Sequence, residues 1–442
     1  MSISHKIAVI GSGASGFYTA LNVLKHKPAT HVHIFEKNPN PFGLVRYGVA
    51  PDHPEVKNCI DSFNELSESP NFQYFGNVEV GNNGSTIGLK EMHEKYNAVV
   101  YAYGANAPNI PRIAGSDHPG VIDSFSFVNW YNGHPKFKDL NVPLEKVKNV
   151  AIVGNGNVAI DIIRILLADP KHWEKTDISD IALEKLRESK VEHVSVVARR
   201  GVLESKFTNK ELRELLELEG VKFQGWNKEE MMKQIEDTKL DRINKRRISL
   251  LDKNYEKDGF KTWDIKYLHD PIGVKVKNNE LLEDLICKRN KVVKSESGDW
   301  KIENDLGINN VQCDLVITAT GYKCEPLDDF EDIGIKFAGK IINNDGKIEG
   351  INNGYAVGWI RTGATGNINS TYVDSTLVSD MIINDLKNDN EFKSGIDREL
   401  KNAIDWSSWE KIHEYEVLKG KEEGKPMKKI SFDEMLSLVK RD

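Results

Sequence analysis

The chain has 442 residues, of which 39% are hydrophobic and 29% charged, and its formal net charge is -7. This length allows roughly three domains, and the composition is that of a globular protein whose cores form without disulfides or structural metals. The acidic balance argues against nucleic-acid binding, because phosphate-tracking surfaces are usually strongly basic. No stretch approaches the ~18 uninterrupted apolar residues of a membrane span, so we expect no integral membrane segment.

The start of the chain bears on location. The first strand-like run begins at Lys6, which leaves no room for a signal peptide, and residues 1–5 lack an Arg-rich amphipathic presequence. We therefore expect a cytoplasmic protein. A mitochondrial matrix protein whose leader had been removed would show the same pattern, so that alternative stays open.

Residues 6–36 predict a strand, a glycine turn, a helix and a second strand, which together form a βαβ unit. The turn is Gly11-Ser12-Gly13-Ala14-Ser15-Gly16. Gly11 permits a tight turn, Gly13 lets the backbone approach a pyrophosphate, and Gly16 lets helix and strand pack closely. Glu36 ends the second strand about 20 residues later, where a carboxylate accepts hydrogen bonds from a ribose. The pattern predicts a bound dinucleotide, with a purely structural glycine turn as the alternative.

His53 lies in the rigid turn Pro51-Asp52-His53-Pro54. Imidazole titrates near neutral pH, so His53 is a candidate to relay a proton to a reduced flavin. It is equally a candidate to cap and shape the loop. Farther on, residues 97–104 predict another buried strand, and the turn-rich residues 105–111 predict the exit from the first domain.

A second βαβ unit begins at Val150. Its loop is Gly154-Asn155-Gly156-Asn157-Val158-Ala159, and its second strand, residues 193–199, ends in Arg199-Arg200 with no acid. A guanidinium pair binds a 2′-phosphate through charge-assisted bonds, whereas a carboxylate would repel it. The two loops therefore predict different ligands, which we interpret as FAD in the first and NADP(H) in the second. The alternative for the arginines is a solvated strand end.

Residues 241–247 are basic in an otherwise acidic chain. At helical spacing, Arg242, Lys245, Arg246 and Arg247 predict a positive patch that steers an acidic protein partner at salt-sensitive rates. The alternative is a solvated helix face.

Residues 313–321 predict a further strand that closes the second domain. The chain then returns to the first domain, where residues 355–358 predict a short strand and residues 370–386 predict an amphipathic helix. The start of that helix, preceded by Gly366-Asn367-Ile368, is positioned to aim amides at the pyrimidine end of a flavin. Trp359 is a candidate to pack on the same ring, or else an ordinary core aromatic. Beyond residue 387 the chain is highly charged, with a helix predicted around residues 404–415 and another near residues 432–439.

We therefore predict an α/β protein with two Rossmann-like βαβ nucleotide-binding domains, the NADP domain inserted in the FAD domain. The first part of the FAD-binding domain spans residues 1–105, the NADP-binding domain residues 106–324, the second part of the FAD domain residues 325–387, and a charged helical tail residues 388–442. The four cysteines, Cys59, Cys287, Cys313 and Cys324, are too scattered for a redox pair or a metal or cluster site. Hence we expect no metal, and we expect electrons to leave for an external acceptor.

These residues resemble the adrenodoxin reductase family of ferredoxin-NADP reductases. The most specific match is the long run at residues 42–57. Further matches lie at residues 35–37, 76–81, 130–133, the second loop with Asp161, 199–201, 210–214, 321–323 and 358–359. We place no family counterpart for the tail, whose role the sequence leaves open.

The resemblance implies roles for particular residues. It implies FAD contacts from Ser15, Glu36, Leu44, Val80, Trp359, Gly366, Asn367 and Ile368, with Gly366 where the two cofactors meet. It implies NADPH contacts from Asn155, Gly156, Asn157, Val158, Arg199, Arg200 and Glu211. It also implies that the basic run docks a small acidic [2Fe-2S] ferredoxin.

The predicted activity is therefore transfer of electrons from NADPH through FAD to a [2Fe-2S] ferredoxin, one at a time, by a ferredoxin- or adrenodoxin-NADP reductase, which we expect to be a monomer. Neither glycine loop is accompanied by a nucleophile or by paired carboxylates. This is consistent with hydride transfer between nicotinamide and flavin, which requires mainly close stacking of the two rings. The alternatives are an NADPH-dependent flavin monooxygenase, a reductase subunit of a larger complex and a non-catalytic NADP-binding regulator.

Overall fold

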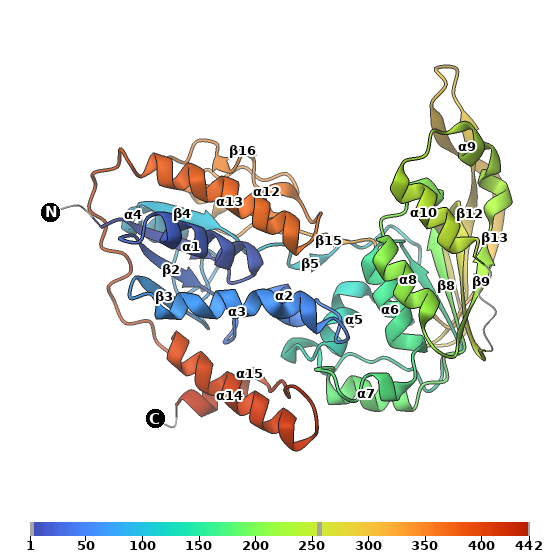
Figure 1. Cartoon of the computed structure of the whole chain (residues 1–442), viewed down its shortest axis with the longest axis horizontal. Helices are drawn as coiled ribbons and strands as arrows, with labels where there is room; N and C mark the ends of the chain where they lie inside the picture. The colour runs from blue at the N-terminus through green and yellow to red at the C-terminus, as the bar shows by residue number, and fades with distance from the viewer. Residues whose placement is uncertain (1–3, 254–258, 441–442) are drawn as a thin grey trace. The chain divides into compact units, whose positions relative to one another are not determined.

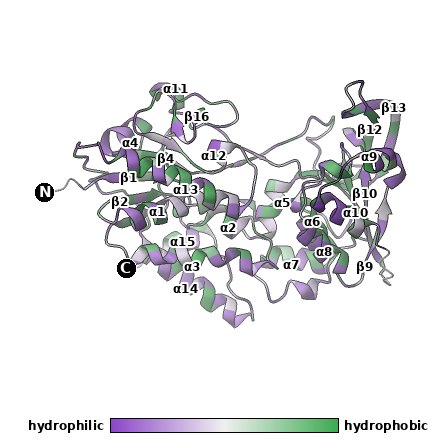
Figure 2. Cartoon of the chain, turned by 45° about the horizontal axis from the view of Figure 1, so that its top comes forward, coloured by the Kyte–Doolittle hydropathy of each residue, from purple (hydrophilic) through white to green (hydrophobic). Residues whose placement is uncertain are grey.

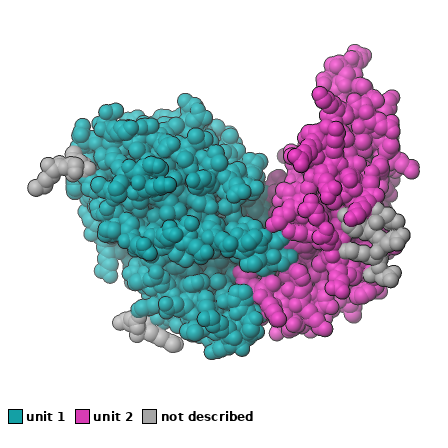
Figure 3. All heavy atoms as spheres, in the orientation of Figure 1, with its two compact units in different colours: residues 1–107, 132–135, 322–442 teal, residues 108–131, 136–321 magenta. Residues whose placement is uncertain are grey.

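A computed structural model describes residues 4–253 and 259–440 (Figure 1). The chain divides into two compact units, drawn in different colours in Figure 3. Unit 1 comprises residues 1–107, 132–135 and 322–442, and unit 2 comprises residues 108–131 and 136–321. Unit 2 is thus inserted in unit 1, and the predicted boundaries after residues 105 and 324 lie close to two of the points where the chain passes between the units.

Unit 1 is built on a seven-stranded sheet in the order β16-β17-β18-β4-β1-β2-β3, in which the five strands from β18 to β3 are parallel. Its strands are β1 (Lys6–Ile10), β2 (His31–Phe35), β3 (Phe72–Phe75), β4 (Ala98–Tyr101), β16 (Asn343–Asn344), β17 (Lys347–Ile348) and β18 (Gly354–Ala356). Its helices are α1 (Ala14–His26), α2 (Gly43–Tyr47), α3 (Cys59–Asn64), α4 (Leu89–Lys95), α11 (Phe330–Ile333), α12 (Trp359–Thr362), α13 (Ile368–Asp385), α14 (Trp406–Glu422) and α15 (Phe432–Val439). Two short strands, β5 (Ala107–Pro108) and β15 (Tyr322–Lys323), lie where the chain passes between the units.

The alternation of side chains along β1 divides the core of unit 1 in two. Ile7 and Val9 pack in one cluster with residues of α1, α13 and α14, whereas Ala8 and Ile10 pack in another with residues of α4. Both faces of the sheet are therefore covered, which explains why its strands are apolar runs rather than alternating ones. Along α14, hydrophobic and hydrophilic residues are mixed, as expected for a helix with one buried face (Figure 2).

Unit 2 contains a six-stranded parallel sheet in the order β6-β14-β7-β8-β10-β9 and a three-stranded antiparallel sheet, β11-β12-β13. Its strands are β6 (Val121–Asp123), β7 (Asn149–Val153), β8 (His193–Ala198), β9 (Val221–Trp226), β10 (Lys261–Tyr267), β11 (His269–Val276), β12 (Leu282–Lys294), β13 (Trp300–Gln312) and β14 (Leu315–Thr318). Its helices are α5 (Ser124–Tyr131), α6 (Asn157–Leu167), α7 (Asp180–Arg187), α8 (Asn209–Glu217), α9 (Met232–Asp237) and α10 (Arg242–Leu251).

The predicted class, an α/β protein with two Rossmann-like units of which one is inserted in the other, is confirmed. Strand β1 starts and ends where the sequence predicts, and α13 begins two residues before its predicted start. The tail, predicted as a region of its own, lies in unit 1, where Gly76 and Ile404 exchange backbone hydrogen bonds of 2.8 and 2.9 Å. Among the described residues, no helix is both long and apolar enough to cross a bilayer.

Candidate functional site

The first glycine loop joins β1 to α1, and each of its glycines has a distinct steric reason. Gly11 has φ +108°, and a Cβ there would lie 2.6 Å from the Cα of Tyr103. A Cβ on Gly16 would lie 2.2 Å from the carbonyl oxygen of Gly11. At Gly13, by contrast, a Cβ would meet no protein atom within 4 Å. The loop is therefore closely packed at both ends, at Gly11 and Gly16, and has free space beside Gly13. A pyrophosphate can approach the backbone on this open face.

The start of α1 offers backbone donors at this open face. Its N-cap, Gly13, supplies no side-chain cap, and the first turn has no acidic residue. Such a helix start attracts a phosphate, which binds the exposed N–H groups at the positive end of the helix dipole. Ser15, in the first turn, is buried, and its hydroxyl donates to the carbonyl of Ala102 at 3.2 Å.

Glu36 turns its carboxylate back onto the loop. Oε2 accepts the backbone N–H of Ser12 at 3.1 Å and its hydroxyl at 2.7 Å, while Oε1 accepts the N–H of Asn38 at 2.9 Å. A carboxylate offers about four acceptor positions, so capacity remains for ribose hydroxyls. The side chain stands at the end of β2, where the sequence predicts a ribose-binding acid.

Helix α2 begins directly against the loop. The N–H of Phe42 donates to the carbonyl of Ser12 at 2.9 Å, and a Cβ on Gly43 would lie 3.5 Å from the Cα of Gly13. Leu44 is half-buried in this helix, and Val80 is buried in the core on the β1 face opposite α1. The predicted FAD contacts Leu44 and Val80 thus lie in the same unit as the loop.

His53 shapes a turn through its backbone. Its N–H donates to the carbonyl of Ala50 at 3.0 Å, and its carbonyl accepts the N–H of Val56 at 3.1 Å, at the entry to a 3₁₀ helix, Pro54–Asn58. The side chain is buried in the folded chain. The backbone bonds fit the loop-shaping interpretation, while the proton relay stays a prediction.

A pocket of about 330 Å³ lies between α12 and the start of α13, lined by Trp359, Gly366 and Asp374 among others. Asp374 is its buried carboxylate: Oδ2 accepts the N–H of Gly358 at 2.6 Å and Oδ1 accepts Nε–H of Arg361 at 2.7 Å. Trp359 is partly buried in the core, 6.0 Å from the ring of Tyr322 between centroids. The predicted residues Trp359 and Gly366 therefore line one cavity.

The beginning of α13 is capped in a defined way. The side chain of Asn367 accepts the N–H of Ser370 at 3.1 Å, and the hydroxyl of Ser370 accepts the N–H of Asn367 at 2.8 Å. Gly366 precedes the cap with φ +87°, and a Cβ there would lie 2.2 Å from Oγ of Ser370. Ile368 is the first helical residue. This reciprocal cap leaves other first-turn N–H groups available to a ligand oxygen.

The second glycine loop, in unit 2, resembles the first at its two glycines. Gly154 has φ +124°, and a Cβ there would lie 2.2 Å from the carbonyl oxygen of Ala319. Gly156 is open, with no protein atom within 4 Å of a Cβ. Asn157 begins α6 and its Oδ1 accepts the N–H of Thr208 at 2.8 Å, while Asn155 accepts two backbone N–H groups on its carbonyl. Val158 is half-buried in the first turn of α6.

Arg199 and Arg200 follow β8 and are both exposed. Their backbones are fixed: the carbonyl of Arg199 accepts Nδ2–H of Asn290 at 2.9 Å, and that of Arg200 accepts the N–H of Leu268 at 3.3 Å. Glu211, by contrast, is engaged with a buried arginine, since Nη1 of Arg164 lies 3.0 Å from its Oε2. The guanidinium groups are thus presented to solvent at the end of the second βαβ strand.

The basic run forms α10, and one residue must be removed from the predicted patch. Arg242, Lys245 and Arg246 are exposed, but Arg247 is only 5% exposed. Its guanidinium donates to Oδ1 of Asn244 at 2.6 Å and to the carbonyl of Phe207 at 3.1 Å. The prediction that Arg247 faces a partner is wrong, because the inner face of the amphipathic helix uses it to satisfy buried carbonyls.

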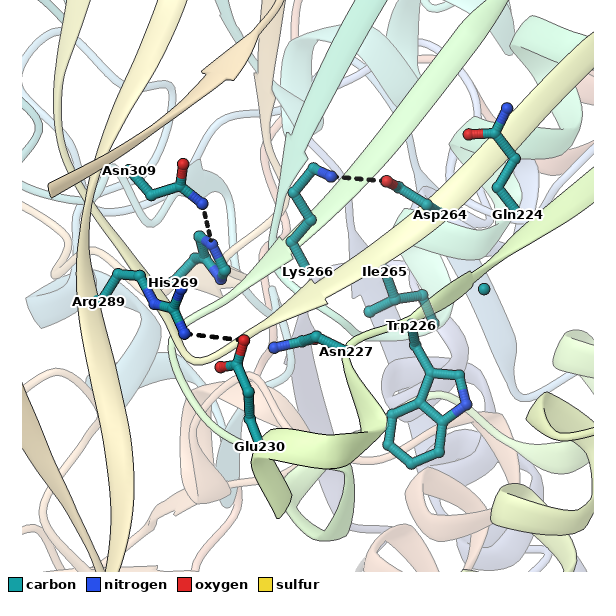
Figure 4. Close-up of a pocket in the computed structure, with 11 residues that line it drawn as sticks. Gln224, Trp226, Asn227, Glu230, Asp264, Ile265, Lys266, His269, Arg289 and Asn309 are labelled. Carbon is teal, nitrogen blue, oxygen red and sulfur yellow. Dashed lines mark hydrogen bonds and ion pairs between the residues drawn. The ribbon is translucent and has the colours of Figure 1, made fainter. Parts of the chain in front are cut away.

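A pocket that the sequence did not predict, of about 380 Å³, lies in unit 2 (Figure 4). Its charged lining residues pair with each other, Lys266 with Asp264 at 2.7 Å and Arg289 with Glu230 at 2.8 Å. Nε2 of His269 accepts Nδ2–H of Asn309 at 2.8 Å, and desolvation lowers the pKa of this histidine. The charges of these two pairs balance, so this pocket offers no preference for an anion or a cation.

The four cysteines are all free. Burial raises the pKa of Cys287 to about 12 and that of Cys324 to about 11, so both are thiols at neutral pH.

Asp374 is a residue that sequence reasoning missed. No motif marks a carboxylate whose partners, Gly358 and Arg361, lie across a turn.

The chain is similar to known oxidoreductases along nearly its full length. Residues 5–249 match the pyridine nucleotide-disulphide oxidoreductase family. The chain is 38% identical to the probable NADPH:adrenodoxin oxidoreductase, mitochondrial, of Saccharomyces cerevisiae, over 97% of this chain and 95% of that one. It is 34% identical to the NADPH-ferredoxin reductase FprA of Mycobacterium tuberculosis, over 96% of each chain.

The fold is similar as well. A solved structure of Mycobacterium tuberculosis FprA in complex with NADPH matches with a TM-score of 0.88 and 33% identity, covering 99% of both chains. This coverage leaves too few residues unmatched to account for residues 388–442. The tail, for which the sequence alone placed no family counterpart, is therefore matched in this structure.

Proposed function

Because this chain belongs to the family of NADPH:adrenodoxin and NADPH-ferredoxin oxidoreductases, we propose that it carries electrons from NADPH through FAD to a ferredoxin with a [2Fe-2S] centre. The predicted family, enzyme class and cofactors, FAD and NADP(H), are confirmed at this level. The observation that supports this proposal most directly is the pair of glycine loops, in each of which the first glycine is closely packed and the second has open space beside it.

Unit 1 fits FAD. The open face at Gly13 and the uncapped start of α1 would receive the pyrophosphate, and Glu36 would bind the ribose. Ser15, Leu44, Val80, Trp359 and the segment Gly366, Asn367 and Ile368 would complete the site. The start of α13 would then place backbone N–H groups at the flavin's pyrimidine end.

Unit 2 fits NADP(H). Gly156 and the start of α6 would receive the pyrophosphate, with Asn155, Asn157 and Val158 beside it. Arg199 and Arg200, both exposed, would bind the 2′-phosphate as a bidentate charge pair. We assign Glu211 to holding Arg164, so that its contribution to NADPH binding is indirect.

The bound flavin supplies the conversion of a two-electron donor, NADPH, into single electrons that a [2Fe-2S] centre can accept. The residues of this chain bind and orient the two cofactors. They supply no disulfide as an internal acceptor, because all four cysteines are free and burial raises the thiol pKa of Cys287, Cys313 and Cys324. An external acceptor therefore receives the electrons, and the exposed cations of α10 are positioned to attract an acidic one.

The domain assignment follows the units: FAD binding by unit 1, residues 1–107, 132–135 and 322–442, and NADP binding by unit 2, residues 108–131 and 136–321. We expect no nucleic-acid partner. We propose that the protein works as a monomer in the cytoplasm or, where a leader has been removed, in the mitochondrial matrix. Gel filtration of the purified chain tests the monomer.

The activity is tested with the purified protein under anaerobic conditions. A yellow protein that bleaches on addition of NADPH, and that turns over rapidly only when a [2Fe-2S] ferredoxin is added, is expected. Rapid NADPH oxidation in air without ferredoxin would instead support a monooxygenase, and a colourless protein would support a binding protein without redox activity.

A further inference from the structure

A buried ion pair joins the C-terminal segment to the region of the predicted flavin site. Nη2 of Arg46, in α2, lies 2.6 Å from Oε1 and 2.8 Å from Oε2 of Glu416, in α14. Arg46 is 4% exposed and Glu416 is fully buried. Each ion depends on the other, because an unpaired charge in such a place is strongly unfavourable.

The surroundings of the pair hold it in one arrangement. Oε1 of Glu416 also accepts the N–H of Ile430 at 3.1 Å. The guanidinium of Arg46 lies over the rings of Tyr47, at 5.2 Å, and Trp409, at 5.4 Å. The pair thus links α2 both to α14 and to the segment that leads into α15.

Helix α2 also begins in direct contact with the first glycine loop. The N–H of Phe42 donates to the carbonyl of Ser12, and Gly43 lies against Gly13. The ring of Phe42 lies 6.2 Å from that of Trp406 and 5.9 Å from that of Trp409, both from α14. The C-terminal segment therefore contacts α2 through both a charge pair and an aromatic cluster.

We propose that Glu416 is a positioning residue for the flavin: it fixes Arg46, and through it α2, against the first glycine loop. The C-terminal helices are then part of the FAD site rather than an appendage. This inference rests on the proposed binding of FAD by unit 1. Residues 42–47 touch the loop from one side and the C-terminal helices from the other, so movement of Glu416 is transmitted to the FAD cleft.

The test compares Glu416→Gln with Glu414→Gln in the holoenzyme. Glu414 lies on the same helix but is exposed, so it is the matched control. FAD release is followed by the rise of flavin fluorescence after dilution, and secondary structure by far-ultraviolet circular dichroism. Glu416→Gln should release FAD about tenfold faster than the wild type at a temperature where its secondary structure is intact, a change that corresponds to about 1.4 kcal/mol. Glu414→Gln should match the wild type.

Equal release rates for Glu416→Gln and the wild type would overturn the proposal, as would loss of FAD only when the whole protein unfolds. If Glu416→Gln does not fold, Glu416→Asp keeps the charge but retracts it by one methylene. This variant must then show faster FAD release, and release at the wild-type rate would overturn the proposal. A wild-type protein that binds no FAD at all would instead refute the proposed function.

Discussion

Oδ2 of Asp374 accepts the backbone N–H of Gly358 at 2.6 Å, so helix α13 is tied to the turn that opens α12. Gly358 itself has φ +69°, a conformation that favours glycine. The other carboxylate oxygen binds Arg361, which closes the same turn from its far side. One buried carboxylate therefore fixes both the position of Trp359 and the direction of the α13 start.

Replacement of Asp374 by Asn should loosen this turn. The neutral amide removes the ion pair with Arg361 and weakens the buried hydrogen bond from the N–H of Gly358. We expect the free energy of unfolding to fall by about 1–3 kcal/mol. We also expect the visible absorption bands of bound FAD to shift. Denaturant unfolding and flavin absorption spectra measure the two effects. Asp380→Asn, at an exposed position of the same helix, should leave both unchanged.

Two glycines of the first loop, Gly13 and Gly16, predict different outcomes for the same substitution. Gly16→Ala places a Cβ 2.2 Å from a backbone oxygen, so it should destabilise the protein even without FAD. Gly13→Ala meets no protein atom within 4 Å, so it should leave the apoprotein as stable as the wild type and weaken FAD by about tenfold or more. Thermal unfolding of the apoprotein and titration with FAD separate these effects. Equal loss of stability in both variants would mean that Gly13 is structural.

Arg199 and Arg200 predict a difference between nicotinamide cofactors. Replacing both by Ala should raise the KM for NADPH by at least about a hundredfold, since each charge-assisted contact to a phosphate contributes about 1.5–3 kcal/mol. The KM for NADH should change little, because only NADPH carries the 2′-phosphate. Steady-state reduction of a dye acceptor with each cofactor measures this. Equal losses for both cofactors would show that the arginines do not bind that group.

Much of this organisation is predictable because local patterns determine it. The strands β1 and β2 are continuous apolar runs, and the glycines between them specify a turn by their lack of a Cβ, so the βαβ unit follows from residues close in sequence. Arg247 shows the limit of such reasoning. Helical spacing identifies a basic run, but it does not say which of the cations faces inward.

Contacts between residues distant in the sequence are not predictable in this way, because the patterns are local. Arg46 and Glu416 are separated by most of the chain, and a lone glutamate in a charged tail has no feature that marks it as fully buried. The three-stranded sheet β11-β12-β13 was not predicted either, since charged and polar residues interrupt the apolar positions of its two long strands, β12 and β13. Its place in unit 2 follows from tertiary packing, which local propensity does not report.

Buried histidines predict how stability depends on pH. Desolvation, with a smaller contribution from Lys6, lowers the pKa of His33 to about 3, whereas the unfolded chain binds a proton near 6.5. Between these values the unfolded state holds more protons, so stability falls as the pH is lowered, by up to about 1.4 kcal/mol per pH unit for this residue. Denaturant unfolding at pH 6.5 and 4.5 should show a smaller difference in His33→Gln than in the wild type. His26→Gln, at an exposed position of unit 1, should keep the wild-type difference.

The exposed cations of α10 lead to a prediction about the rate at which an acidic ferredoxin is reduced. Reversing the charge at the exposed residues Arg242 and Arg246, each to Glu, should slow reduction of an acidic ferredoxin by about tenfold or more at low salt. The effect should shrink as ionic strength rises, because salt screens the attraction. Reduction of a small neutral dye should proceed at the wild-type rate. Stopped-flow and steady-state assays with both acceptors measure these rates.

Two controls separate docking from folding. Lys222→Glu with Lys233→Glu changes the net charge by the same amount at exposed positions of unit 2 outside α10 and should leave ferredoxin reduction nearly intact. Arg247→Ala should instead destabilise the protein, since it removes the partner of the carbonyl of Phe207 and of Asn244. If the Arg242 and Arg246 reversal slows dye and ferredoxin reduction together, the patch acts through structure. If it slows neither, the acceptor docks elsewhere, because local charge on α10 is the reason for expecting an acidic partner there.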